Sequence, residues 1–321
     1  KQKMPRHSKP RHGSLQFYPR KRANKILPRV NWDSIPKEEK GLKGFIGYKV
    51  GMKSAYVLDS TQHSLTKGKK IIIPITIIEC PVIKILSIRF YKHGIVVKEI
   101  LNDNLDKELK RKLTLPKQAE AKKKLESFKE DYEDIRIIAY SQVKKTGIKK
   151  SPDIAEIGLS GSKEDKLQFV KDNLSREISI KEVFKTEVVD VRGVTKGKGF
   201  QGQVKRFGLC LKAHKSEKGV RTLGTGGAWH PARVTFREPR AGQMGFFTRA
   251  VYNSKIVDIS SINEKDINPK EGFKHFGKIK TDYILVFGSV QGANKRQLLI
   301  TNPLRPDEKQ SRKNYELIEI R

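Results

Sequence analysis

The stretch from Thr195 to Arg249 constrains the fold of this chain more than any other. Between Arg192 and Arg249 there are thirteen Lys and Arg residues but only two acids, Glu217 and Glu238. Glycine recurs throughout the stretch, and so few apolar side chains cannot bury a core of their own. A segment of this length without a helical or strand period is uncommon in a compact domain unless it is functional. We therefore expect residues 196–245 to form a basic finger inserted into an ordered domain.

The centre of the finger carries one large apolar side chain, Trp229, followed by His230, Pro231 and Arg233. An aromatic ring that can stack on a base, next to cations that can bind phosphates, is typical of RNA recognition. A lone Trp is more often a core residue. The glycines at 224, 226 and 227 and the following proline make a core position unfavourable, and we predict a finger that inserts into RNA.

Composition narrows the class of partner. The 321 residues are 36% hydrophobic with 25 glycines, close to a globular protein, and the length suggests two structured units. Lys and Arg number 68 against 35 Asp and Glu, a net charge of +33. Self-repulsion on this scale favours a polyanionic partner, which leaves RNA, DNA or an acidic membrane surface.

The sequence gives little support for a membrane-spanning or a secreted protein. No apolar run approaches eighteen residues, so we expect no membrane span, and the first residues lack the apolar core of a secretion signal. Two cysteines, Cys80 and Cys210, do not make a disulfide framework and fit a reducing, cytoplasmic compartment.

Residues 1–42 read as a basic N-terminal arm. Its first 32 residues hold ten Lys and Arg and no acid, with four prolines that disfavour a long helix. Interleaved aromatics such as Phe17 and Tyr18 favour an extended arm that orders on RNA. A solvated tail and a nuclear localisation signal at Arg20-Lys21-Arg22 are the alternatives.

Periodicity predicts a mostly β fold with an α/β insertion. Gly44–Met52 and Ser54–Leu58 read as a hairpin, 71–78 as a buried strand with Pro74 at an edge, bulge or break, and 82–90 and 95–100 as a hairpin through Lys92-His93-Gly94. Strands at 186–194, 245–259, 281–290 and 297–301 follow the insertion. The sequence therefore predicts a small barrel built from 43–100 and 186–321 and interrupted by the finger.

The inserted region, 101–185, is expected to contain helices and a strand. Leu105, Leu109 and Leu113 recur at helical spacing, and a second helix would begin at Pro116 and run to Tyr132. A strand is expected at 134–143. Ser162 with Asp165 predicts a capping box that opens a helix, and a shorter helix is expected at 179–184.

Two patterns imitate cofactor and metal sites. Gly197-x-Gly-x-x-Gly202 fits a dinucleotide fingerprint, but no helical period follows it and the required acid is missing, so glycines that let the backbone approach RNA phosphates explain it better. Cys210, His214 and His230 lack the paired spacing of a zinc site. No catalytic triad or carboxylate cluster is seen. We expect no cofactor, no metal, no small-molecule substrate and no enzymatic activity.

Three ordered motifs carry a resemblance: Lys196-Gly-Lys-Gly-Phe-Gln-Gly202, the run Gly-Ala-Trp-His-Pro-Ala-Arg-Val at 227–234, and Ala-Gly-Gln-Met-Gly at 241–245. Together they resemble the universal ribosomal protein L-three family. Pro-Arg-His-Gly-Ser at 10–14 and Gly-Phe-Ile-Gly-Tyr-Lys-Val-Gly-Met at 44–52 are similar to its archaeal and eukaryotic branch. The sequence departs from the family at Phe246-Phe247, where Tyr-His is expected.

The resemblance implies a six-stranded barrel like that of translation elongation factors, with long basic extensions in ribosomal RNA. It implies a structural protein of the cytoplasmic large subunit that supports early assembly, contacts neighbouring ribosomal proteins and brings its finger near the peptidyl-transferase centre. His214 falls where some members carry a methylated histidine. The candidate residues for binding 23S-type rRNA are Arg6, Arg11, Arg20, Lys21, Arg22, Lys196, Lys198, Lys205, Arg206, His214, Arg221, Trp229, His230, Arg233, Arg237 and Arg249.

Two other function classes remain open at this level. An rRNA-modifying enzyme with a basic arm would need a carboxylate cluster or cofactor loop, and neither is found. A DNA-compacting protein would not need a Trp-tipped, Gly-rich finger, and a preference for rRNA over duplex DNA would separate it from an rRNA-binding protein.

Overall fold

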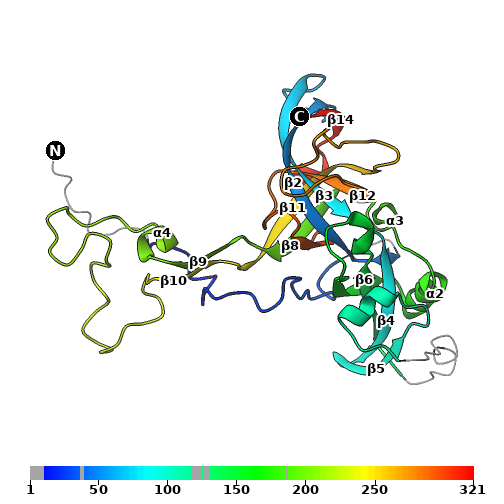
Figure 1. Ribbon diagram of the computed structural model, residues 1–321, viewed down its shortest axis with the longest axis horizontal. Coiled ribbons are helices and arrows are strands. Elements are labelled where there is room, and N and C mark those ends of the chain that lie inside the picture. Colours follow the sequence, from blue (N-terminus) through cyan, green and yellow to red (C-terminus); the bar gives the residue numbers. More distant parts are fainter. Residues whose placement is uncertain (1–10, 37–39, 117–124, 126–130, 186) are drawn as a thin grey trace. The chain divides into compact units, whose positions relative to one another are not determined.

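The computed structural model describes residues 11–36, 40–116, 125, 131–185 and 187–321. The chain divides into two compact units (Figure 1). Unit 1 comprises Lys1–Asn24 and Thr195–Thr248, and unit 2 comprises Lys25–Val194 and Arg249–Arg321. The fold is mostly β, as the sequence predicts, and no helix in the described residues is long and apolar enough to cross a membrane.

Unit 2 contains a seven-stranded sheet in which every strand except β14 pairs with at least two others. The strand order is β13-β8-β11-β12-β3-β2-β14, and β13 also pairs with β2. Leu299 of β13 pairs with Arg192 on one side and with Ile46 on the other, whereas β14 pairs with the far half of β2. The strands are β2 (Gly44–Asp59), β3 (Lys70–Cys80), β8 (Val188–Val194), β11 (Thr248–Ser261), β12 (Asp282–Phe287), β13 (Gln297–Thr301) and β14 (Tyr315–Ile320).

The hairpin expected at 44–58 is wrong, because β2 is one continuous strand of 16 residues. Its glycines serve packing and a bulge instead of a turn. A Cβ atom on Gly47 would lie 2.6 Å from Ile78 Cγ2, so the position needs glycine for close packing against β3. Gly51 lies where the β2–β3 register shifts, which marks a β-bulge.

Pro74 lies where the prediction allowed it, at the end of a ladder. β12 pairs with β3 only from Cys80 to Ile75. Beyond that point the Pro74 carbonyl accepts the N–H of Gly288, while Pro74 itself is paired with Ser54 of β2. Proline has no N–H to donate. Because the pairing between β12 and β3 has ended at this residue, no hydrogen bond between the two strands is lost.

A five-stranded sheet, in the order β1-β7-β6-β4-β5, forms the second layer of unit 2. The expected hairpin through His93-Gly94 is confirmed, but its two strands belong to this sheet and not to the one that contains β2, which differs from the expected grouping of 43–100. The strands are β1 (Gly41–Leu42), β4 (Ile83–Lys92), β5 (Ile95–Leu101), β6 (Asp134–Ser141) and β7 (Ile154–Ser160).

The two sheets share one hydrophobic core, which contains residues of both. Tyr48 of β2 contributes a polar link to this core: its hydroxyl donates to Asp153 Oδ2 at 2.6 Å and lies 2.6 Å from Ser141 Oγ. Trp32 is buried over the five-stranded sheet, and a Cβ atom on Gly158 would lie 2.7 Å from Trp32 Cβ. Burial of this indole fixes the segment that leads into β1.

In the inserted region, the helices predicted from capping residues are confirmed, whereas the helix predicted from the leucine spacing is not. Ser162 and Asp165 form the predicted capping box at the start of α2 (Lys163–Asn173), and Ser179 caps α3 (Ile180–Val183). Around Leu109 the chain forms only a 3-10 turn, η1 (Lys107–Arg111), instead of a longer helix. The helix expected from Pro116 to Tyr132 lies largely outside the described residues. Unit 2 also contains a second 3-10 turn, η2 (Val143–Thr146), and α5 (Glu308–Ser311).

Unit 1 contains a two-stranded sheet of β9 (Gly197–Gln201) and β10 (Gly242–Gly245), followed in sequence by α4 (Gln203–Phe207) after β9. The sequence predicted no helix after Gly202, and that prediction is wrong. The α4 helix is five residues long and is closed by Gly208 in the left-handed conformation. It is short enough that no hydrophobic period could reveal it.

Candidate nucleic-acid interface

The base of the finger is a ladder of backbone hydrogen bonds. Gly245 of β10 pairs with Gly197 of β9, and beyond them the Thr195 N–H donates to the Phe247 carbonyl at 2.9 Å. The Phe246 N–H donates to the Lys196 carbonyl at 3.2 Å. Both bonds use the backbone. The Phe246-Phe247 departure from the family pattern therefore leaves them intact.

Gly245 is required at this position for two reasons. Its φ of +72° is in the region that favours glycine, and a Cβ atom there would lie 2.0 Å from the Lys196 carbonyl oxygen. The glycine therefore permits the close approach of the two strands that begin and end the finger.

The N-terminal arm packs on the base of the finger within unit 1. The Ala23 N–H donates to the Phe246 carbonyl at 2.9 Å. Arg20 Nη1 donates to the Arg206 carbonyl at 2.9 Å, and Arg206 Nη2 donates to the Arg20 carbonyl at 3.0 Å. The arm and finger, which the sequence suggested as two separate extensions, are thus joined by a reciprocal pair of arginine contacts.

Arg206 acts as a brace inside unit 1. Besides the Arg20 carbonyl, its guanidinium donates to the carbonyls of Gln243 at 2.8 Å and Arg240 at 2.9 Å. Burial, and then the positive charge of Arg20, lower the pKa of Arg206. The planar fork of an arginine suits this role because it can satisfy several carbonyls at fixed angles. Its donors are directed at the protein backbone.

Phe207 is the centre of an aromatic cluster that packs against the N-terminal arm. It is 7% exposed, Tyr18 stacks on it with ring centroids 6.2 Å apart, and the Arg20 guanidinium lies 4.2 Å above its ring. A Cβ atom on Gly13 would lie 2.8 Å from Phe207 Cδ1. Sequence reasoning missed this cluster. The Gly in the motif at 10–14 was a signal of close packing, but its partner lies almost two hundred residues away.

The remaining candidates in the described part of unit 1 are exposed. Trp229 is 89% exposed, so in this structure it is not a core residue. His214 lies in a loop whose backbone bond joins Ser216 to Ala213. The exposed set is Arg11, Lys21, Arg22, Lys196, Lys198, Lys205, His214, Arg221, Trp229, His230, Arg233 and Arg237.

Three candidate residues differ from the exposed, unpaired cations in their position or contacts. Arg6 lies outside the described residues. Arg11 is exposed but directs its guanidinium at backbone carbonyls, at 2.6 Å to Gly13 and also to Arg237. Arg249 is half-buried in β11 and belongs to unit 2, where its carbonyl accepts from Gln291 Nε2 at 3.1 Å.

The basic side chains in the described part of unit 1 form no ion pairs. In residues 11–24 and 195–248, no basic side chain lies within 4 Å of a carboxylate, and the two acids are Glu217 and Glu238. In unit 2 many acids are paired with cations, for example Asp33 with Arg136 at 2.9 Å and Asp134 with Lys166 at 2.6 Å. Unit 1 therefore presents an excess of positive charge that only an external anion can compensate.

The glycine pattern at 197–202 does not have the structure of a dinucleotide-binding site. Gly197 and Gly199 lie in a strand that pairs antiparallel with β10, and the following helix has one short turn, unlike a dinucleotide-binding unit. The described residues contain no cluster of three His, Cys, Asp or Glu side chains that could hold a metal ion. Unpaired cations, an exposed indole and glycine-permitted backbone are the chemistry of nucleic-acid binding.

Comparison with known proteins agrees with this chemistry. The sequence pattern of the family described as ribosomal protein L3 matches residues 4–321. The large ribosomal subunit protein uL3 of Methanobrevibacter smithii is 41% identical over 321 residues, covering 95% of each chain. The protein of the same name from Methanocaldococcus jannaschii is 41% identical, with 94% of this chain and 93% of the other covered. That of Pyrobaculum neutrophilum is 39% identical, with 94% of each chain covered.

These relatives come from archaea, which confirms the resemblance to the archaeal and eukaryotic branch. The match includes the arm, both sheets of unit 2 and the finger. The chain therefore belongs to the ribosomal protein L3 family.

Proposed function

We propose that this chain binds large-subunit rRNA chiefly through unit 1, with the arm and the finger acting as one element. Its family is one of structural ribosomal proteins of the large subunit and not of enzymes. The observation that carries the proposal is the set of exposed cations in unit 1 that no carboxylate neutralises. Neutralising phosphates releases condensed counterions, so these cations are a source of affinity for RNA.

The finger tip is proposed to make a local contact instead of supplying bulk affinity. Trp229 is exposed on a Gly-rich backbone next to His230 and Arg233, which suits stacking on an unpaired base. Following the resemblance, we propose that the tip approaches the peptidyl-transferase centre, and that the chain supports early assembly of the subunit beside neighbouring ribosomal proteins. One aromatic–base stack contributes about 1–3 kcal/mol, a small share of a surface with many phosphate contacts.

We also propose that the six strands β13, β8, β11, β12, β3 and β2 form an elongation-factor-like barrel. The supporting observation is the double pairing of β13, with β8 on one side and β2 on the other. A cluster of buried side chains that includes Val57, Ile75 and Leu285 packs among these strands, as a filled small barrel requires. Two of these strands, β8 and β11, flank the finger in sequence.

The salt dependence of rRNA binding tests the proposal. If about ten phosphates are neutralised, log affinity should fall with log salt with a slope of roughly −7 to −9. The triple variant Lys21→Gln, Arg22→Gln, Lys205→Gln removes three exposed cations of unit 1. Its slope should be shallower by about 2–3, since each contact contributes about 0.7–0.9.

A matched control removes three exposed lysines of unit 2, Lys67, Lys69 and Lys278, by the same change to Gln. The control should leave the slope nearly unchanged although its net charge is the same as that of the unit 1 variant. Equal slopes for the two triple variants would show that only net charge matters, and would remove the assignment to unit 1.

A further inference from the structure

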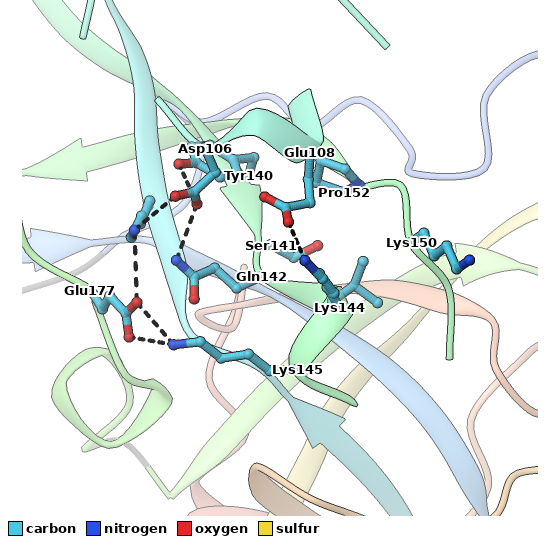
Figure 2. A pocket seen from close by; sticks show the side chains of 12 residues that line it. Asp106, Glu108, Tyr140, Ser141, Gln142, Lys144, Lys145, Lys150, Pro152 and Glu177 are labelled. Carbon is cyan, nitrogen blue, oxygen red and sulfur yellow. Dashed lines mark hydrogen bonds and ion pairs between the residues drawn. The ribbon is translucent and has the colours of Figure 1, made fainter. Parts of the chain in front are cut away.

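Two open hollows on unit 2 differ in how many of their charged lining residues form ion pairs. The first, about 520 Å³, lies beside β4, β6 and η1 and is drawn in Figure 2. Among the described residues, three of the four lysines in its lining are neutralised, and only Lys150 is not: Lys84 contacts Asp106 at 3.2 Å, Lys144 contacts Glu108 at 2.6 Å, and Lys145 contacts Glu177 at 2.8 Å. This hollow has little charge left to offer a ligand.

The second hollow, about 480 Å³, lies between the bulge of β2 and the segment 269–274. Three lysines line it, Lys53, Lys270 and Lys274, and none of them pairs with a carboxylate in the described residues. Glu271 is the only acid in its lining. The lining also includes Met52, which is 46% exposed, so the hollow combines an apolar surface with unsatisfied positive charge.

The wall of this hollow is held in place by backbone bonds. The Phe273 N–H donates to the Gly277 carbonyl at 2.8 Å, and the Gly277 N–H donates back to the Phe273 carbonyl at 3.0 Å. The Asn268 amide clamps the end of the same loop, since its Oδ1 accepts from the Ile279 N–H at 2.8 Å and its Nδ2 donates to the Ile279 carbonyl. A preformed hollow spares a ligand the cost of ordering the loop.

One further polar group is fixed at the rim. Asn294 Nδ2 donates to the Lys274 carbonyl at 2.8 Å, which leaves its Oδ1 as an acceptor in the lining. The carboxylate of Glu271 is a second acceptor. The hollow therefore offers an apolar surface, two acceptors for amino groups, and three cations.

We propose that this hollow holds an unstacked nucleotide from a single-stranded segment of RNA. The volume lies in the usual range for ligand sites. A base can lie against Met52 while its amino group donates to Asn294 or Glu271, and the lysines bind the flanking phosphates, which is how single-stranded RNA is generally recognised. The three lysines of the lining favour a polyanion such as RNA over a protein surface that carries few acids. The inference rests on the proposed function, because it assumes that rRNA reaches unit 2 as well as unit 1.

Site-resolved crosslinking separates the two claims. The full chain is mixed with a single-stranded octaribonucleotide that carries one 4-thiouridine, irradiated, and digested, and the crosslinked peptides are identified by mass spectrometry. We expect crosslinks both in unit 1 peptides and in peptides that contain residues 50–53 or 269–274.

Two variants with the same change in charge provide the control. Met52→Glu places a carboxylate in the hollow, whereas Ile72→Glu places one at another exposed apolar position of the same sheet, outside the lining. Met52→Glu should lower the crosslink yield at the hollow at least about fivefold, because a carboxylate replaces the apolar surface under the base and repels the flanking phosphates. Ile72→Glu should leave it unchanged, and unit 1 yields should stay the same in both variants.

The outcomes are distinguishable. Crosslinks in unit 1 but none at the hollow would overturn the inference and leave the proposed function standing. Equal losses from Met52→Glu and Ile72→Glu would also overturn it, because the effect would then follow from net charge alone. Absence of crosslinks in unit 1 would contradict the proposed function itself, whatever happens at the hollow.

Discussion

Neighbouring basic residues in unit 1 make different contacts. Lys205 is exposed and unpaired, whereas the Arg206 guanidinium donates to three backbone carbonyls and contacts the Phe207 ring. The sequence predicts the same phosphate-binding role for both, because it shows only their charge. What distinguishes them is the direction of the donors, which in Arg206 point at the carbonyls of Arg20 in the arm, of Arg240, and of Gln243 in β10. We propose that the arginine maintains the RNA-binding surface and that the lysine is part of it.

Exchanging the two roles gives a test at single residues. Arg206→Lys keeps the charge but loses the fork. In the rRNA-bound protein, where unit 1 is protected, hydrogen exchange at the Ala23 and Gly208 amides should therefore become faster, corresponding to a loss of about 1–3 kcal/mol of local stability. The salt slope of RNA binding should not change. Lys205→Gln should do the reverse, with unchanged exchange and a slope shallower by about 0.7–0.9. Faster exchange in Lys205→Gln than in Arg206→Lys would show that Arg206 is not the brace.

Elements with local signals could be predicted from the sequence, and those defined by distant partners could not. The capping box at Ser162 and the turn at His93-Gly94 specify their elements within a few residues. In contrast, β2 reads as a hairpin because Gly47 and Gly51 resemble turn residues, although one meets Ile78 and the other makes a bulge. The β9–β10 pair and the arm–finger contact join residues far apart in sequence, so no local pattern indicates them.

The loop between β2 and β3 shows how one buried carboxylate can specify an element. Asp59 is buried, and its oxygens accept from the Thr61 N–H at 2.9 Å, from Ser64 Oγ at 2.8 Å, and from the Thr66 hydroxyl. Burial alone would raise the pKa of Asp59. The hydrogen bonds outweigh burial and lower the pKa from its ordinary value of 3.8.

This shift predicts how the loop responds to pH. Because the pKa of Asp59 is lower in the folded loop than in the unfolded one, its contribution to stability is complete above about pH 4 and is lost as the pH falls toward the folded value. Protection of the Gly68 amide, which donates to the Asp59 carbonyl, should therefore decrease in acid. In Asp59→Asn the protection should be low already at neutral pH and nearly independent of pH. A variant with the same acid-induced loss as the wild type would contradict this role.

At the scale of the whole molecule, the two units differ in how much apolar surface they bury and in how their charges are paired. In the described residues, the large buried clusters and the ion pairs lie in unit 2, whereas unit 1 has a few backbone bonds, one aromatic cluster and many unpaired cations. Unit 2 has the means to be stable alone. Unit 1 gains its full stability only when an anion offsets its charge, because self-repulsion opposes its compact state.

Amide hydrogen exchange of the full chain, with and without large-subunit rRNA, tests this account most directly. Without RNA, the strands of both sheets in unit 2 should be strongly protected, while residues 11–24 and 195–248 exchange quickly. With rRNA, protection should rise in both segments of unit 1 together, because the Arg20–Arg206 contacts join them. Equal protection of the two units in the free protein would contradict the account, as would an RNA-induced gain confined to unit 2.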